Sequence, residues 1–98
     1  MTAHRAAAPI RNPSGLHARP AVKLTKLAKS FPGALEIALS AEGPWVDAKS
    51  MVRVMKLKAA PGTVLHVRGE DAAAVAALAD LARRDFDEGP GSGGPAAA

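Results

Sequence analysis

The chain of 98 residues contains no cysteine, and aromatic side chains make up only 3% of it. The absence of cysteine excludes disulfide scaffolds, cysteine-based zinc sites and thiol catalysis. The scarcity of aromatics argues against a platform on which nucleic-acid bases stack. No uncharged apolar run approaches the ~20 residues that a membrane span needs, and no secretory signal opens the chain. We therefore expect a cytoplasmic domain without membrane insertion.

The residues that are present are enough for one domain with a modest core. The hydrophobic fraction is 48%, but alanine supplies much of it. The chain has 13 basic and 9 acidic residues, which gives a formal net charge of +4. A surplus of positive charge favours negatively charged partners through long-range attraction. It does not by itself distinguish nucleic acid from an acidic protein surface.

Glycine and proline turns divide the chain into seven predicted elements. Strands are expected over 6–10, 35–39, 45–47 and 63–68, and helices over 18–29, 51–57 and from a cap at Asp71 to about Phe86. Short connections favour an antiparallel sheet with the helices on one face, which is an α+β two-layer domain. We expect this domain to span 1–88, followed by a flexible tail over 89–98 that is rich in Gly, Pro and Ala.

The helix expected over 18–29 carries a stripe of lysines beside its apolar face. Lys23, Lys26 and Lys29 recur at intervals of three. Pro20 fits only in the first turn of a helix, where its missing N–H would have no partner. The helix should therefore begin close to His17.

The most informative segment is Gly15-Leu16-His17-Ala18-Arg19-Pro20-Ala21. It places an imidazole at the start of a helix, after a glycine and two residues before a guanidinium. Backbone N–H groups and the positive end of the helix dipole form an anion site there, and an arginine fork suits phosphate oxygens. A phosphoryl group on His17 would sit where these donors converge. His4 and His66 are expected to be ordinary surface residues, since three scattered histidines make a poor metal site.

This segment resembles the histidine-containing phosphocarrier protein (HPr) family of the bacterial phosphoenolpyruvate-dependent phosphotransferase system. A second matching block runs from Lys49 to Met55, and the similarity covers about residues 6–87. The resemblance implies an open-faced β-sandwich, a four-stranded antiparallel sheet covered on one face by three helices (βαββαβα). Val22 stands where the family usually has a smaller residue, and Lys58 where it commonly has glycine.

The resemblance also implies a phosphoryl carrier rather than an enzyme, with no cofactor. His17 would accept phosphate on Nδ1 from phosphorylated enzyme I and pass it to a IIA domain of the sugar phosphotransferase system. Arg19 would steady the phosphoryl group, and the N–H groups of Ala18 and Arg19 would bind its oxygens. Ser50 matches the serine that an HPr kinase/phosphorylase modifies in some bacteria, and it is also a plain candidate for a helix N-cap.

Docking onto these partners would use an exposed patch with basic residues around it. Flexible methionines suit a surface that fits several partners in turn. The alternative is that these side chains belong to the core, because a short helix must also bury some of its side chains. The expected docking residues are Lys23, Lys26, Lys29, Met51, Val52, Arg53 and Met55. We expect a monomer that binds no nucleic acid.

Three other interpretations stay open at this point. A nitrogen-related or regulatory member of the same family would keep the His17 chemistry and use a different acceptor. A small basic nucleic-acid-binding domain would bind with a steep salt dependence and without His17. A regulatory scaffold that has lost phosphoryl transfer would tolerate His17→Ala.

Overall fold

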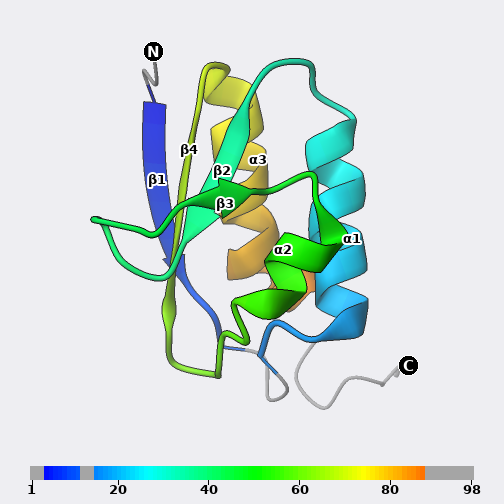
Figure 1. Cartoon of the computed structure of the whole chain (residues 1–98), viewed down its shortest axis with the longest axis vertical. Coiled ribbons are helices and arrows are strands. Elements are labelled where there is room, and N and C mark those ends of the chain that lie inside the picture. Colours follow the sequence, from blue (N-terminus) through cyan, green and yellow to red (C-terminus); the bar gives the residue numbers. More distant parts are fainter. Residues whose placement is uncertain (1–3, 12–14, 88–98) are drawn as a thin grey trace.

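A four-stranded antiparallel sheet with three helices forms the domain (Figure 1). The computed structural model describes residues 4–11 and 15–87. The strands are β1 (His4–Pro9), β2 (Leu35–Ala38), β3 (Val46–Asp47) and β4 (Val64–Gly69). The helices are α1 (Ala18–Lys29), α2 (Met51–Lys56), α3 (Ala72–Arg83) and the 3-10 turn η1 (Asp85–Asp87). The predicted α+β open-faced sandwich with βαββαβα order is confirmed.

The sheet has the strand order β1-β4-β2-β3, and every pairing is antiparallel. Along β4, Leu65 and Val67 are fully buried, whereas His66 between them and Arg68 after them are half-buried. This alternation turns one face of the sheet toward the core. Pro9 ends β1, an edge strand, where a residue without an N–H is tolerated. The sheet therefore has one packed face and one open face.

The helices supply the other half of the core through small and branched side chains. On α1, Ala21, Leu24 and Ala28 have no exposed surface, as the apolar spacing predicts. Helix α3 packs against β1 and β4, and α1 packs against both α2 and α3. The largest fully buried side chains are those of Phe86, Ile10, Leu24, Leu35, Ile37, Leu65 and Leu78.

Two expectations about element ends need correction. The last helix ends at Arg83, and Phe86 lies in a left-handed turn with φ 55° rather than on the helical stripe, although it is still fully buried. The first strand begins at His4 rather than at residue 6, and His4 is an exposed residue of that strand. The boundary at residue 88 and the expected tail over 89–98 lie outside the described residues.

A stack of polar and aromatic side chains covers part of the open face of the sheet. The Arg68 guanidinium lies 4.2 Å from the centre of the Trp45 ring, and the Arg5 guanidinium lies 5.5 Å from it. Arg68 also forms an ion pair with Glu36, with an Nε–Oε1 distance of 2.8 Å across β4 and β2. Such cation–π contacts are worth about 0.5–1 kcal/mol at exposed sites. They help to hold the two-residue strand β3 at the sheet edge.

None of the helices in the described ranges is long and apolar enough to cross a bilayer.

Candidate functional site

The loop before α1 is fixed by a backbone contact with the loop after α2. The Leu16 N–H donates to the Ala59 carbonyl at 2.9 Å, and both side chains are buried. Gly15 has φ +67°, and a β-carbon added there would lie 2.4 Å from the same carbonyl oxygen. Only glycine fits this close approach. The contact sets where the chain enters α1, and so where His17 stands.

His17 is the N-cap residue of α1, as the sequence predicts, with an extended backbone (φ −110°). Its carbonyl accepts the Ala21 N–H at 2.9 Å, which is the first i→i−4 bond of the helix. Pro20 has no N–H, so the amides of Ala18 and Arg19 are the donors that precede this bond. The His17 side chain makes no capping hydrogen bond. The ring is thus held at the positive end of the helix without being used by the backbone.

A shallow hollow opens beside the His17 ring. It has a volume of about 450 Å³ and is lined by Leu16, His17, Met55, Lys58, Ala59, Ala60 and Pro61. The ring is half-buried, and Ala18 and Arg19 beside it are exposed. A group on another molecule can therefore reach the imidazole from solvent.

Ser50 caps the short helix α2, as predicted, and its Oγ accepts the Arg53 N–H at 3.3 Å. The residue before it, Lys49, donates from Nζ to the Phe31 carbonyl at 2.6 Å. This bond joins the start of α2 to the segment that follows α1. Val54 anchors α2 in the core with no exposed surface.

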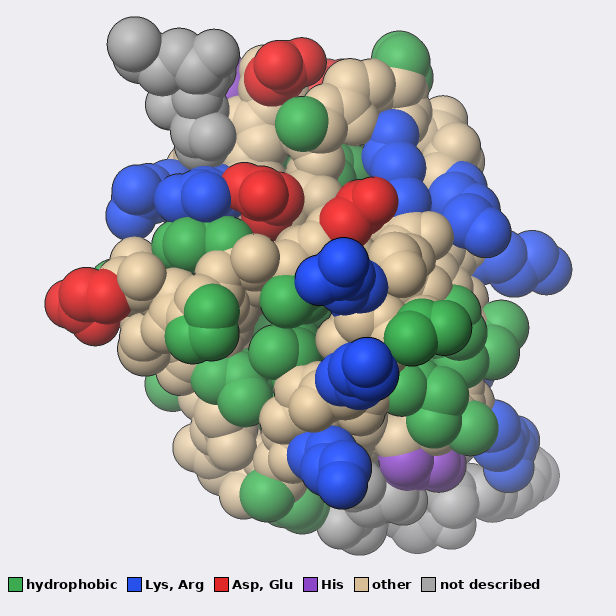
Figure 2. Space-filling view, in the orientation of Figure 1, with side chains coloured by type: hydrophobic (Ala, Val, Ile, Leu, Met, Phe, Trp, Pro, Cys, Tyr) green, Lys and Arg blue, Asp and Glu red, His purple; other side chains and the backbone are tan. Residues whose placement is uncertain are grey.

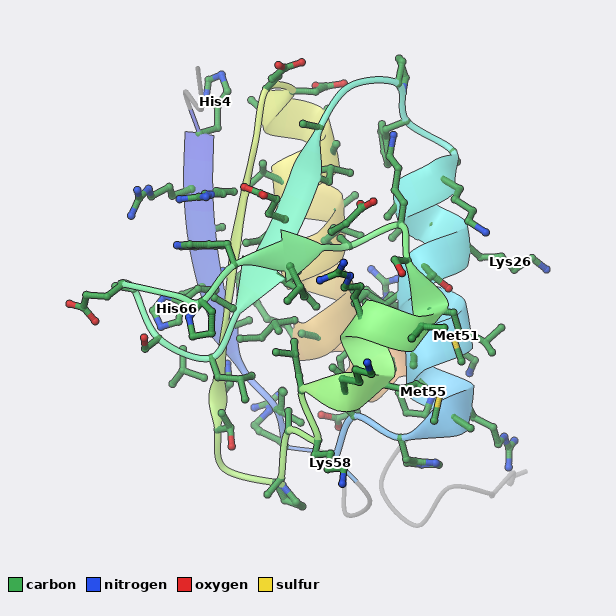
Figure 3. All side chains as sticks on the ribbon, viewed as in Figure 1. His4, Lys26, Met51, Met55, Lys58 and His66 are labelled. Atoms are coloured by element: carbon green, nitrogen blue, oxygen red, sulfur yellow. The ribbon has the colours of Figure 1, made fainter. Side chains whose placement is uncertain are left out.

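Helices α1 and α2 together expose an apolar surface. The α1–α2 patch, as we call it, consists of Val22, Met51, Val52 and Met55. Val52 is 64% exposed, Val22 46% and Met55 39%, whereas Met51 is half-buried against the core. The Thr25 hydroxyl lies 3.1 Å from the Val22 carbonyl and 3.8 Å from the Met51 sulfur, so it joins the two helices. Figure 2 shows apolar side chains gathered over this side of the molecule, and Figure 3 shows Met51 and Met55 within it.

Val22 is a member of the patch that the sequence interpretation missed. A single valine in a helix does not reveal from the sequence whether its side chain is exposed. The apolar spacing of α1 does not show which side of the helix α2 covers. The structure shows that Val22 lies outside the buried face of α1.

The basic residues expected around the patch are spread over α2 and two sides of α1. Arg53 is exposed on α2, and Lys29 is exposed in the last turn of α1. Lys23 and Lys26 instead line a separate groove toward the end of α3, together with Leu27, Ser30, Leu81, Arg84 and Asp87. Figure 3 shows Lys26 pointing away from α2. The four cations do not form one ring.

Arg84, on the far wall of that groove, is already paired. Its Nε lies 3.0 Å from Asp87 Oδ1, and Asp80 contacts the same guanidinium. The Asp87 hydrogen bond, followed by the charges of Asp87 and Asp80, raises the pKa of Arg84 above its ordinary value. This guanidinium is therefore engaged within the chain.

The other two histidines lie apart from this region. Figure 3 shows His4 and His66 on the sheet, away from α2. Among residues 4–11 and 15–87, no three histidine, aspartate or glutamate side chains gather closely enough to hold a metal ion.

Comparison with known proteins assigns the chain to a family. A family model described as the PTS HPr component phosphorylation site matches residues 5–84. The chain belongs to the HPr family. Phosphocarrier protein HPr of Xylella fastidiosa (strain Temecula1) is 42% identical over 82 residues, which cover 81% of this chain and 90% of the relative. HPr of Pseudomonas putida is 43% identical over 83 residues, 82% of this chain and 91% of the relative.

Solved HPr structures share the fold. HPr-C-His from Thermoanaerobacter tengcongensis is similar with a TM-score of 0.78 and 30% identity, over 89% of this chain and 99% of that one. An HPr dimer from the same organism gives a TM-score of 0.62 at 32% identity, over 79% of this chain and 90% of that one. The family resemblance, the phosphotransferase-system context and the fold expected from the sequence are thereby confirmed.

The contact between the two loops can be tested with a pair of glycine substitutions. Gly15→Ala combines a left-handed backbone with a clash, so we expect it to lower the free energy of unfolding by about 2–5 kcal/mol. Gly62→Ala is the control, because Gly62 has φ +92° and open space around the added β-carbon. It should cost only about 1–2 kcal/mol for the backbone conformation. Urea unfolding measures both, and equal losses would contradict the steric account.

Proposed function

We propose that this HPr-family chain carries a phosphoryl group on Nδ1 of His17, between enzyme I and a IIA domain. The observation that carries the proposal is the position of His17. Its ring lies at the N-terminus of α1, makes no capping hydrogen bond and borders an open hollow. A histidine used only for packing would be enclosed or bonded to the backbone.

Transfer needs one bond to form as another breaks. The lone pair of the His17 ring nitrogen attacks the phosphorus carried by enzyme I, and the N–P bond forms. The bond between phosphorus and its carrier atom on enzyme I breaks, and that atom keeps the electron pair. In the second transfer an acceptor atom of the IIA domain attacks the phosphorus and forms a new bond to it. The N–P bond breaks, and the ring nitrogen keeps the electron pair, which returns His17 to its starting state.

The start of α1 supplies what the phosphoryl group needs. The amides of Ala18 and Arg19 point toward the helix N-terminus, where backbone N–H groups bind anions. The exposed Arg19 side chain offers a planar fork suited to phosphate oxygens. The helix dipole contributes about 0.3–1 kcal/mol to an anion at this end, or up to ~2 kcal/mol in a favourable geometry. Stabilisation of this size tunes a phosphohistidine and still lets the group leave.

Labelling with enzyme I and radioactive phosphoenolpyruvate tests the carrier function. The wild-type chain should take up one acid-labile phosphate, since a phosphoramidate bond to histidine hydrolyses in acid. His17→Gln should take up none, while His66→Gln should label like the wild type because His66 lies on the sheet. Label that is stable in acid, or that persists in His17→Gln, would rule out the proposal.

We further propose that the α1–α2 patch is the docking surface for both partners. Three of its four side chains expose at least 39% of their surface, and exposed apolar patches of this kind mark interaction sites. Arg53 on α2 and Lys29 at the end of α1 would steer the patch toward acidic partner surfaces. The half-buried Met51 anchors the patch and also serves the core.

A charge placed in the patch should weaken docking and leave the chemistry intact. We expect Val52→Asp to raise the KM for transfer from enzyme I by about tenfold or more, because a carboxylate would face the partner and need desolvation. The matched control is Val64→Asp, which changes a valine that is 41% exposed on β4 and should keep the wild-type KM. Phosphorylation by phosphoramidate, which needs no protein partner, should be equal in all three chains. Equal KM values for the two variants would argue against this surface.

Ser50 is a candidate regulatory site beside this surface. Ser50 is half-buried and its Oγ already caps α2, and Met51 and Val52 of the patch follow it directly. A phosphate on Ser50 would add about −1.5 to −2 charges there. Against an acidic partner surface, that charge would oppose docking.

The effect of charge at Ser50 can be separated from the effect of the cap. Aspartate and asparagine are both good N-caps, so Ser50→Asp and Ser50→Asn differ mainly in charge. We expect Ser50→Asp to slow transfer from enzyme I about tenfold at low salt, whereas Ser50→Asn should keep the wild-type rate. The transfer rate at low and high salt measures this. A loss of rate in Ser50→Asn of the same size would show that only the cap matters.

A further inference from the structure

Lys58 has a backbone conformation that lysine rarely adopts. Its φ is +52°, directly after Leu57, the C-cap of α2. Its N–H donates to the Met55 carbonyl at 3.2 Å, which closes the last turn of the helix. Left-handed residues at the end of a helix are usually glycine. A lysine at this position therefore carries a conformational cost that glycine would not. A role for its side chain would explain why lysine stands here.

The Lys58 side chain borders the same hollow as the His17 ring. Apart from these two residues, the described residues that line it are Leu16, Met55, Ala59, Ala60 and Pro61, all uncharged. Lys58 is exposed, and it forms no ion pair with any residue in the described ranges. Figure 3 shows it beyond Met55, past the end of α2. An ammonium that forms no ion pair with the described residues thus stands at the edge of the candidate site.

The backbone fixes the relation between the two side chains. Lys58 immediately precedes Ala59, whose carbonyl accepts the Leu16 N–H, and Leu16 immediately precedes His17. The contact that positions the ring therefore also positions the stem of Lys58. The remaining conformational freedom is in the flexible Lys58 side chain. This flexibility would let its ammonium follow a phosphoryl group as that group arrives and leaves.

We propose that Lys58 is a second cation for the phosphoryl group on His17, on the side of the hollow opposite to α1. The proposal rests on the proposed function and adds a residue to it. Arg19 and the helix amides approach the phosphoryl group from α1, and Lys58 approaches it from the loop after α2. The ammonium binds phosphoryl oxygens as a mobile point charge, the manner in which lysine differs from the arginine fork.

The expected effect is modest because the site is open to water. A unit charge within about 10 Å of the phosphoryl group in nearly aqueous surroundings favours its dianion over its monoanion by about two- to fivefold. At about 0.1 M salt the Debye length is about 10 Å, so added salt should reduce the effect. The charge should therefore lower the pH at which the phosphoryl group ionises.

Phosphorus NMR of the chemically phosphorylated protein tests this without any partner. Phosphoramidate donates its phosphoryl group to the ring nitrogen of the full chain and releases ammonia, and the phosphorus resonance is then followed against pH. Removal of the charge in Lys58→Gln should raise the titration midpoint by about 0.3–0.7 pH units at low salt, with a smaller shift at high salt. Lys58→Arg should stay near the wild type. Lys56→Gln is the matched control, because it removes an equal exposed charge from α2 outside the hollow.

Lys58→Gly tests whether a change in the titration midpoint comes from the lost charge or from a disturbed backbone. It removes the charge and relieves the left-handed backbone, so it should shift the midpoint as Lys58→Gln does without loss of thermal stability. An unchanged midpoint in both Lys58 variants, or an equal shift in Lys56→Gln, would overturn the role of Lys58 and leave the carrier function standing. Failure of the wild-type chain to hold phosphate on His17 would instead overturn the proposed function itself.

Discussion

The site depends on one backbone contact between two loops. The Ala59 carbonyl accepts a hydrogen bond from the Leu16 N–H at 2.9 Å. The lack of a side chain at Gly15 allows the two loops to approach each other this closely. This contact joins the end of α2 to the beginning of α1. Through it the His17 ring, the amides of α1, the α1–α2 patch and Lys58 keep a fixed relation to one another. The sheet and the buried alanine-rich faces hold the two helices whose adjoining loops make this contact.

The same arrangement explains how a carrier can both hold and release its group. The donors at the start of α1 are backbone amides and exposed side chains rather than a buried charged pocket, so each contributes little on its own. The His17 ring is half-buried and borders open space, which leaves the phosphorus accessible to the next acceptor. A deeper site would bind phosphate more tightly and would exclude the partners that must reach it.

Much of this could be predicted from the sequence, because the signals were local. Pro20 predicts the start of α1, and Asp71 and Ser50 are predicted as helix caps, all of which the structure has. The missed features depend on contacts between distant segments. They follow from how α1, α2 and α3 pack against one another. Examples are the close approach of Gly15 to Ala59, the exposure of Val22 beside Met51, and the division of the lysines between two sides of α1. The left-handed turn at Phe86 was missed because its spacing continued that of α3.

The most direct measurement of the central claim is the amide spectrum of the nitrogen-15-labelled chain before and after phosphorylation. If the phosphoryl group sits on Nδ1 of His17 at the start of α1, the largest changes should fall on the amides of Ala18 and Arg19. Phosphorus coupling should appear in the His17 ring alone. Amides of Ala18 and Arg19 that stay unchanged, or coupling to any other side chain, would contradict the account.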